Sequence, residues 1–149
     1  MGKKRIIQQS KEELLKETSN IESKLKKEVK KTSKNIGEAK IYIHSTYNNT
    51  ILTLTDTNGN VLYWSSSGAV GFKGTKKGTP FAASKVAETI CQTAEKMNIK
   101  KIAIVLKGIG AGRDSAIRSI AAKGFDVVSI TDVTPVPHNG CRRRKPRRL

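Results

Sequence analysis

The chain has 149 residues, which suits one domain of about 100 residues with extensions at its ends. Its 29 Lys and Arg residues against 12 Asp and Glu residues give a formal net charge of +17, which indicates a polyanionic partner. The longest apolar run, residues 102–106, is far shorter than the roughly 20 residues of a membrane helix, and the N-terminus lacks an apolar signal-peptide region. We therefore expect no membrane span and no secretion.

The first 38 residues form a basic segment with 11 Lys or Arg and 6 acidic residues. Within residues 10–34, apolar side chains recur at a spacing of about 3.6, which predicts a thin amphipathic helix. The stripe consists of Leu14, Thr18, Ile21, Leu25 and Val29. Because so narrow a stripe gives only a marginal helix in water, we interpret residues 1–38 as a basic, partly helical extension that becomes ordered on a partner.

Three strands with alternating side chains are expected next. Apolar residues recur at every second position over residues 40–46 and 50–55, and a third strand is predicted over residues 61–65. The dipeptide Asn58–Gly59 predicts a two-residue hairpin turn between the second and third strands, because both central residues of that turn need a positive φ. These segments favour an antiparallel meander at one side of a sheet.

The second half of the chain alternates helices and strands. Glycines and lysines over residues 68–78 predict an exposed basic loop, and Thr79–Pro80 supplies an N-cap and a first-turn proline for a helix. The remaining expected elements are a strand at 101–106, a tight turn at 108–112, a helix at 113–123 and a strand at 125–131. The order β-β-β-α-β-α-β predicts an α/β domain at residues 39–134, with a mixed five-stranded sheet and helices packed on it.

The segment Gly108–Arg113 lies between a predicted strand and a predicted helix, where backbone N–H groups and the helix N-terminus can receive a phosphate. A dinucleotide site is disfavoured, because Arg113 stands at the third glycine position of that motif. Two interpretations remain. The segment is either a purely structural turn, or a loop whose amides contact RNA phosphates together with Lys107 and Arg113.

A second glycine-rich segment, residues 71–79, lacks the Gly-Lys-Ser/Thr sequence of an ATP-binding loop. Its lysines Lys73, Lys76 and Lys77 either lie along a nucleic-acid backbone or belong to a solvated loop. Asn48 and Asn49 likewise either turn the chain or offer their amides to sugar and phosphate.

Stacking of bases on aromatic side chains is a further possibility, with Phe72, Tyr47 and Trp64 as candidates. Only 5% of the residues are aromatic, so we expect recognition of RNA backbone and shape rather than stacking.

The titratable residues offer little for catalysis. His138 and Cys141 are only two ligands, too few for a zinc site, and the two cysteines Cys91 and Cys141 do not make a disulfide framework, which favours a reducing compartment. Asp56, Asp114 and Asp132 could hold magnesium in a nuclease, although a turn and a helix start give Asp56 and Asp114 structural roles. We expect no catalytic residues, no metal and no cofactor.

The last 12 residues contain six Arg or Lys residues and no acidic residue. Fixed like charges repel one another unless phosphates neutralise them, and release of counterions from the nucleic acid then favours binding. Residues 135–149 are therefore predicted to be a basic RNA-binding tail.

Four motifs resemble the family of ribosomal protein eleven of the small subunit, in its bacterial or organellar form. They are YNNT at residues 47–50, GFKGTKKGTPFAA at 71–83, KGIGAGR at 107–113 and TDVTPVPHNGC at 131–141. The resemblance spans residues 40–149 and implies a ribonuclease-H-like fold without its activity, seated on the platform of the small subunit. There the family binds several ribosomal RNA helices, neighbours other platform proteins, and helps form the cleft where messenger RNA pairs near its exit, in the Shine–Dalgarno region.

The resemblance also implies, position by position, which residues contact RNA. They are Asn48, Asn49, Lys73, Lys76, Lys77, Lys107, Gly108, Gly110, Gly112, Arg113, His138, Asn139, Gly140, Arg142, Arg143, Arg144, Lys145, Arg147 and Arg148. Two departures concern stiffness: Ile109 and Ala111 stand where the family usually has prolines, as do Arg143 and Arg144 in the tail.

The resemblance, which agrees with the basic composition, implies a structural constituent of the ribosome in the cytoplasm, with an organelle-encoded origin left open. We expect ribosomal RNA and neighbouring platform proteins as partners, with messenger RNA nearby, no small-molecule substrate and no homo-oligomer. An RNA chaperone or RNA-binding module outside the ribosome is the alternative.

Overall fold

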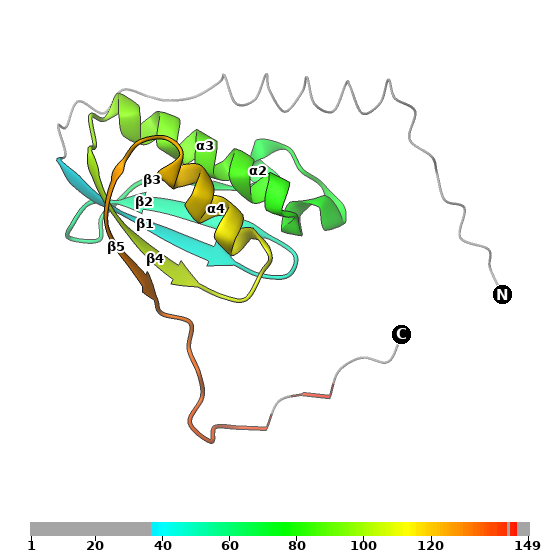
Figure 1. Ribbon diagram of the computed structural model, residues 1–149. Helices are drawn as coiled ribbons and strands as arrows, with labels where there is room; N and C mark the ends of the chain where they lie inside the picture. The colour runs from blue at the N-terminus through cyan, green and yellow to red at the C-terminus, as the bar shows by residue number, and fades with distance from the viewer. Residues whose placement is uncertain (1–36, 143, 146–149) are drawn as a thin grey trace, which may run out of the picture.

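The computed structural model describes residues 37–142, 144 and 145, so the helix expected within residues 10–34 lies outside the described residues (Figure 1). The elements are β1 (Glu38–Ser45), β2 (Thr50–Thr55), β3 (Val61–Ser66), α2 (Ser67–Val70), η1 (Gly74–Gly78), α3 (Pro80–Lys96), β4 (Lys101–Lys107), α4 (Gly112–Ala121) and β5 (Asp126–Asp132). The strands form one sheet in the order β3-β2-β1-β4-β5. β2 is antiparallel to β1 and β3, whereas β4 is parallel to β1 and β5. The expected α/β class and mixed five-stranded sheet are confirmed.

Both long helices, α3 and α4, lie on the same face of the sheet (Figure 1). The period-two pattern of the strands accounts for this, because alternate side chains such as Ile41, Ile43 and Ile104 point toward the helices and are fully buried. On the other face, Trp64 is 59% exposed and Tyr42 is 38% exposed; the two lie in one cross-strand row with Thr53 between them. The core therefore lies between one face of the sheet and the two helices.

Helix α3 begins where the sequence predicts. The Thr79 hydroxyl accepts a hydrogen bond from the Ala82 N–H at 3.2 Å, and Pro80 occupies the first helical position. The helix ends at Lys96, and Asn98 turns the chain toward β4 with a φ of 57°. Neither α3 nor any other helix in the described part of the chain is long and apolar enough to cross a membrane.

The segment expected as an exposed basic loop, residues 68–78, contains regular structure instead. The Ser66 hydroxyl caps α2 by accepting from the Ala69 N–H, and Gly71 ends the helix with a φ of 116°. This reversal returns Phe72 to the core, where it is 9% exposed and meets the Phe81 ring edge to face at 5.9 Å. The prediction of a loop is therefore wrong where α2 and η1 form, although Lys73 and Lys76 are exposed as expected. The suggestion that Phe72 stacks on bases is also wrong.

The hairpin between β2 and β3 is present, but its turn differs from the expected two-residue form. Five residues, 56–60, connect the strands, and Gly59 has a positive φ of 93° whereas Asn58 does not. The Asp56 carboxylate organises the connection, because Oδ1 accepts from the Asn58 and Asn60 N–H groups at 2.9 and 2.8 Å. The Asn60 side-chain amide also donates to Asp56 Oδ2 at 2.8 Å, and this bond, followed by the backbone bonds, holds the pKa of Asp56 below its ordinary value.

The outer strands pair irregularly. The register shifts between Leu54 and Thr55, where β2 meets β3, and between Ile102 and Ala103, where β4 meets β5. β5 is mostly exposed and has an acidic residue at each end. The predicted bounds of β5 and α4 differ from the observed ones by one or two residues, as is usual at the ends of elements.

The two cysteines should differ sharply in reactivity, because Cys91 is fully buried in α3 whereas Cys141 is exposed. Burial, with a smaller effect of Glu95, raises the pKa of the Cys91 thiol to about 12, so almost no thiolate is present at neutral pH. We expect an aromatic disulfide reagent to modify Cys141 in the native protein and Cys91 only after unfolding.

The control is Cys141→Ser, which should show no fast reaction in native buffer and one reacting thiol in denaturant. Fast modification of Cys91 in the native Cys141→Ser protein would contradict the observed packing of α3.

Candidate nucleic-acid interface

Three connections meet at one end of the sheet: the turn at residues 46–49, the segment 74–79 around η1, and the loop at residues 108–112 (Figure 1). Glycines allow them to touch. A Cβ added to Gly78 would lie 2.2 Å from the Tyr47 carbonyl oxygen, which is far inside van der Waals contact. The three connections therefore form one continuous edge, which we name the loop edge.

The loop at residues 108–112 packs against the end of β1 through its backbone. A Cβ on Gly108 would lie 2.1 Å from the Ser45 carbonyl oxygen, and one on Gly110 would lie 2.3 Å from the Thr46 carbonyl oxygen. Gly108 also has a φ of 98°. A Cβ on Gly112, at the start of α4, would likewise lie too close to the Thr50 hydroxyl oxygen, at 2.5 Å. The glycine spacing therefore has a structural cause in this fold.

Two amides of this loop are satisfied inside the chain. The Gly110 N–H donates to the Ser45 carbonyl at 3.0 Å, and the Gly108 N–H donates to the Thr134 hydroxyl at 3.1 Å. A phosphate bound at this loop would therefore accept hydrogen bonds from groups of the loop edge other than these two amides. This geometry favours a structural role for Gly108 and Gly110 and leaves a phosphate contact elsewhere on the loop as a prediction.

The turn at residues 46–49 is held by its first and last residues. The Thr46 N–H donates to the Asn49 carbonyl at 2.8 Å, and the Thr46 hydroxyl accepts from the Asn49 N–H at 3.1 Å. Asn48 and Tyr47 between them are exposed, Tyr47 by 75%. The Asn49 Oδ1 atom is buried and accepts no hydrogen bond from the described residues. Since an unmet buried acceptor costs roughly 1–3 kcal/mol, its donor would be water or a bound molecule.

Basic side chains surround these connections. Lys73 and Lys76 are exposed and Lys77 is half-buried at η1, while Lys107 is exposed at the end of β4 beside His44 of β1. Cations held at fixed spacing favour binding of phosphates, because less conformational entropy is lost on binding than with cations on a flexible chain. Four of the predicted lysines thus lie within the loop edge or directly beside it in the chain.

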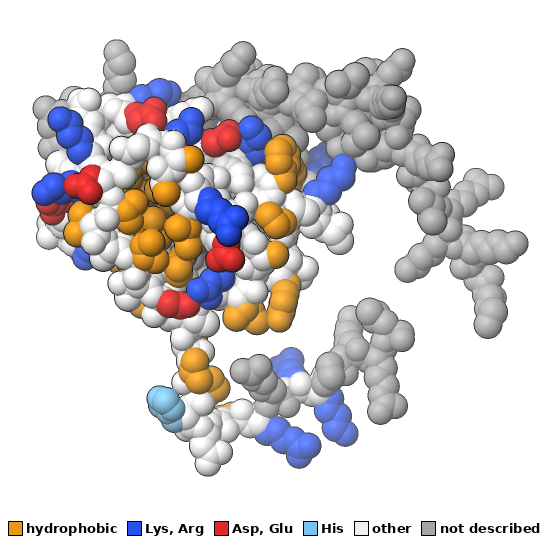
Figure 2. Space-filling model, viewed as in Figure 1, with side chains coloured by type: hydrophobic (Ala, Val, Ile, Leu, Met, Phe, Trp, Pro, Cys, Tyr) orange, Lys and Arg blue, Asp and Glu red, His pale blue; other side chains and the backbone are white. Residues whose placement is uncertain are grey.

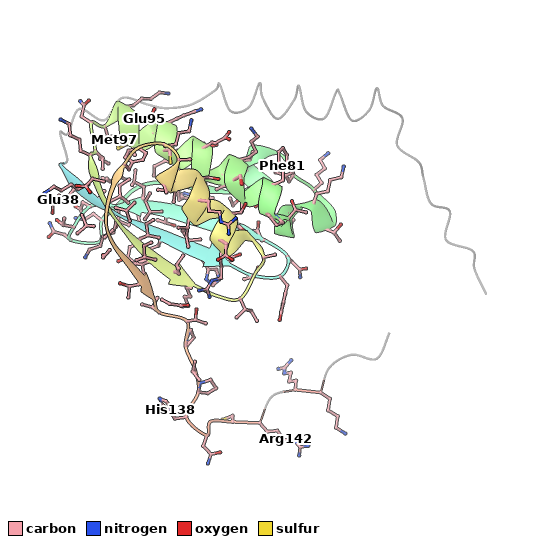
Figure 3. All side chains as sticks on the ribbon, viewed as in Figure 1. Glu38, Phe81, Glu95, Met97, His138 and Arg142 are labelled. Carbon is pink, nitrogen blue, oxygen red and sulfur yellow. The ribbon has the colours of Figure 1, made fainter. Side chains whose placement is uncertain are left out.

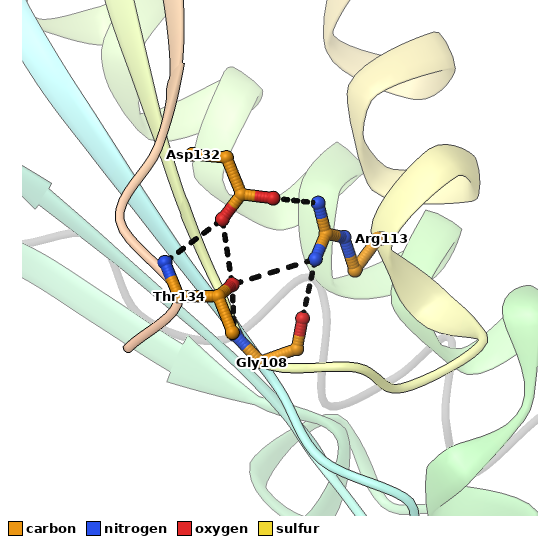
Figure 4. A network of polar contacts seen from close by, with 4 residues as sticks. All are labelled: Gly108, Arg113, Asp132 and Thr134. Atoms are coloured by element: carbon orange, nitrogen blue, oxygen red, sulfur yellow. Dashed lines mark hydrogen bonds and ion pairs between the residues drawn. The ribbon is translucent and has the colours of Figure 1, made fainter. Parts of the chain in front are cut away.

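Arg113 differs from these lysines, because both terminal nitrogens of its guanidinium are bound within the chain (Figure 4). Nη2 forms an ion pair with Asp132 Oδ2 at 2.5 Å, and Nη1 donates to the Gly108 carbonyl at 2.5 Å. The other carboxylate oxygen of Asp132 accepts from the Thr134 hydroxyl at 2.6 Å and from the Thr134 N–H at 2.9 Å. We name this network of Gly108, Arg113, Asp132 and Thr134 the clasp.

Sequence reasoning missed the clasp, although the sequence holds one signal for it. Asp132 and Thr134 stand two residues apart after a predicted strand, which is the spacing at which an Asp side chain caps its own turn. The partner Arg113 lies 19 residues away from Asp132 and could not be deduced from local pattern. The sequence predicts Arg113 as an RNA contact, which stays a prediction; the structure shows that both terminal nitrogens of its guanidinium have partners within the protein.

Beyond Val133, whose N–H donates to the Leu106 carbonyl at 2.9 Å, the chain leaves the domain as the predicted tail (Figures 1 and 3). Its described basic residues carry exposed side chains along this segment (Figure 2). The predicted tail residues that the structure describes are His138, Asn139, Gly140, Arg142, Arg144 and Lys145, all exposed. Arg143, Arg147 and Arg148 lie outside the described residues.

The acidic residues considered for a nuclease do not meet. Asp56 caps the β2–β3 connection, Asp114 lies in the first turn of α4, and Asp132 belongs to the clasp. Across residues 37–142, 144 and 145, no three His, Cys, Asp or Glu side chains form a group that could hold a metal ion. Each carboxylate has a structural explanation of its own.

Replacing Gly110 by Ala should destabilise the domain by about 1–3 kcal/mol, because the new methyl group would overlap the Thr46 carbonyl and the Ser45 hydroxyl. Chemical denaturation measures the difference. Gly37→Ala is the matched control, since nothing lies within 4 Å of its added Cβ. Equal stability of the two variants would show that the loop does not pack as described.

Asp132 should titrate well below an ordinary aspartate. The Thr134 hydroxyl bond first, and the Arg113 bond second, lower its pKa from 3.8 to about 2. Because the folded-state pKa is depressed, the stabilising effect of the clasp is full above the unfolded value near 3.8 and is lost as the pH falls toward about 2. Carboxyl-carbon NMR titration measures the value.

In Thr134→Val the Asp132 pKa should rise toward 3.8, because the largest cause of the shift is removed. An unchanged titration in that variant would contradict the hydrogen-bond geometry of the clasp.

Comparison with known proteins identifies a family for most of the chain. Residues 39–148 match the family model described as Ribosomal protein S11, which covers the whole described domain except its first residues and extends through the tail. The match includes the loop edge, the clasp and the basic tail, and it confirms the resemblance expected from the four motifs. The chain belongs to the ribosomal protein S11 family, whose members are structural proteins of the small ribosomal subunit that bind ribosomal RNA.

Proposed function

We propose that this chain binds ribosomal RNA on the platform of the small subunit, bridges several RNA helices, and helps form the cleft where messenger RNA pairs near its exit. One observation carries the proposal: the basic tail starts beside the loop edge, because the Thr134 hydroxyl accepts from the Gly108 N–H at 3.1 Å. The lysines fixed on the domain and the start of the basic tail thus lie at the same end of the sheet. This arrangement suits contact with more than one RNA helix.

The RNA contacts divide into two groups. Asn48, Lys73, Lys76 and Lys107 are exposed on a rigid edge and would fix the position of the domain on the phosphate backbone. The tail, with Arg residues that can bridge two phosphates through their planar donors, would enter between RNA helices that otherwise repel each other. Lys77 and Asn49 are less exposed and would contact RNA from the rim of the edge.

The proposal divides the chain into a basic extension at residues 1–38, an α/β domain at 39–134 and an RNA-binding tail at 135–149. The hydrogen bond from Val133 to Leu106 supports the second boundary, since it is the last backbone pairing to the sheet among the described residues. The partners are platform proteins and ribosomal RNA rather than a second copy, and the ribosome is a cytoplasmic one, with an organellar ribosome as the alternative. The role is structural and not enzymatic.

Deleting residues 142–149 should leave the domain folded and weaken its binding to small-subunit RNA. Each phosphate that the shortened protein no longer neutralises flattens the slope of log K against log salt by about 0.7–0.9, because fewer counterions are released. Filter binding or calorimetry at several salt concentrations measures the slope. A slope equal to that of the full chain would refute the role of the tail.

The control is Lys96→Gln with Lys100→Gln. Both residues are exposed and lie between the end of α3 and β4, away from the loop edge, so the slope should change less per charge removed than after tail deletion.

The place of the protein in the cell is tested by cosedimentation with small subunits at low and high salt. Retention at high salt, with density at the platform in an electron-microscopy map, is the expected result. Release from the subunit at modest salt, with general RNA annealing activity instead, would favour the chaperone alternative.

A further inference from the structure

The clasp ties together three parts of the chain that are far apart in sequence. Arg113 comes from α4 and Gly108 from the loop edge, whereas Asp132 ends β5 and Thr134 is the last residue before the tail. Its bonds form a closed circuit, because Arg113 reaches Gly108 and Asp132, Asp132 reaches Thr134, and Thr134 returns to Gly108 (Figure 4).

The clasp is the last attachment of the chain to the domain before the tail. Thr134 is half-buried, whereas residues 135–142, 144 and 145 are exposed at every position. In the described part of the chain no hydrogen bond or ion pair joins these later residues to the domain. The direction in which the tail leaves therefore depends on how Thr134 is held.

We propose that Arg113, Asp132 and Thr134 position the tail against the loop edge for RNA binding, and that Arg113 acts through Asp132 and Thr134 rather than as a phosphate ligand. The inference rests on the proposed function, because it concerns how the same RNA surface is presented. Without the clasp the tail would pivot at Val133, and its cations would have to be ordered at the moment of binding, which lowers affinity.

Replacing Asp132 distinguishes positioning of the tail from a simple effect of charge, because the two predict opposite changes in RNA affinity. Removing an acidic residue next to an RNA-binding surface raises the positive potential and should strengthen binding. If the clasp positions the tail, Asp132→Ala in the full chain should weaken binding to small-subunit RNA by about five- to tenfold despite the gain of one positive charge. Asp126→Ala is the matched control, because it removes the same charge from the other, exposed end of β5.

A second pair of variants separates positioning from loss of structure. Thr134→Ser keeps the hydroxyl that joins Gly108 to Asp132 and should bind RNA like the native chain, whereas Thr134→Val should bind as weakly as Asp132→Ala. Thermal melting of each variant confirms that the domain is folded. Equal binding of the Ser and Val variants would overturn the proposal.

Arg113→Gln tests the assignment of Arg113 itself. As a positioning residue it should share its effect with Asp132, so the double variant should bind no worse than either single variant. Both effects should vanish in a chain that ends at Pro137, which has no cations to position. An additive weakening in the double variant, or an undiminished effect of Arg113→Gln in the shortened chain together with a flatter salt slope, would assign Arg113 as a direct ligand and overturn the proposal.

The free protein offers a readout that does not depend on RNA. Hydrogen exchange at the Gly108 amide, which donates to Thr134, should accelerate in Asp132→Ala and stay unchanged in Asp126→Ala. If the native chain failed to bind ribosomal RNA, the proposed function would fall, and this exchange would still report whether the clasp holds the tail. Unchanged exchange at Gly108 in Asp132→Ala would overturn the clasp by itself.

Discussion

The loop edge exists because the backbone after β4 touches the backbone after β1 with only hydrogen atoms between them. At Gly108 and Gly110 a side chain would overlap a carbonyl oxygen of Ser45 or Thr46. Gly78 makes the same kind of approach to Tyr47 from the third connection. These contacts, together with the Gly110–Ser45 hydrogen bond, fix three connections relative to one another before any RNA is present. A surface formed in this way needs little ordering on binding.

Much of the domain follows from local pattern. Alternation in β1 and β2 and the Thr79–Pro80 start of α3 predict those elements correctly because their causes lie within a few residues. The prediction for Phe72 is wrong because a capped turn of helix, invisible in composition, returns this residue to the core. The prediction for the Asn58–Gly59 turn is wrong because the Asp56 carboxylate stabilises a longer connection.

The candidate site is predictable in its composition and not in its internal hydrogen bonding. Glycines and cations indicate the segments of the loop edge and the tail along the chain, because both features are local. The contact between Arg113 and Asp132 and the reason for each glycine could not be predicted from the sequence, because both depend on tertiary packing. The formal charge of +17 also counts cations that have partners within the protein, as Arg113 does in the clasp.

The irregular pairing of the two outer strands affects how readily the free protein could pair with another copy before it binds RNA. A flat, regular outer strand is a template for the strand of another molecule. Here the register shifts where β2 pairs with β3 and where β4 pairs with β5, and such shifts increase the local twist. The acidic residues Asp126 and Asp132 lie at the two ends of β5. These irregularities make both outer strands poorer templates for regular pairing with a second copy in the time before RNA is bound.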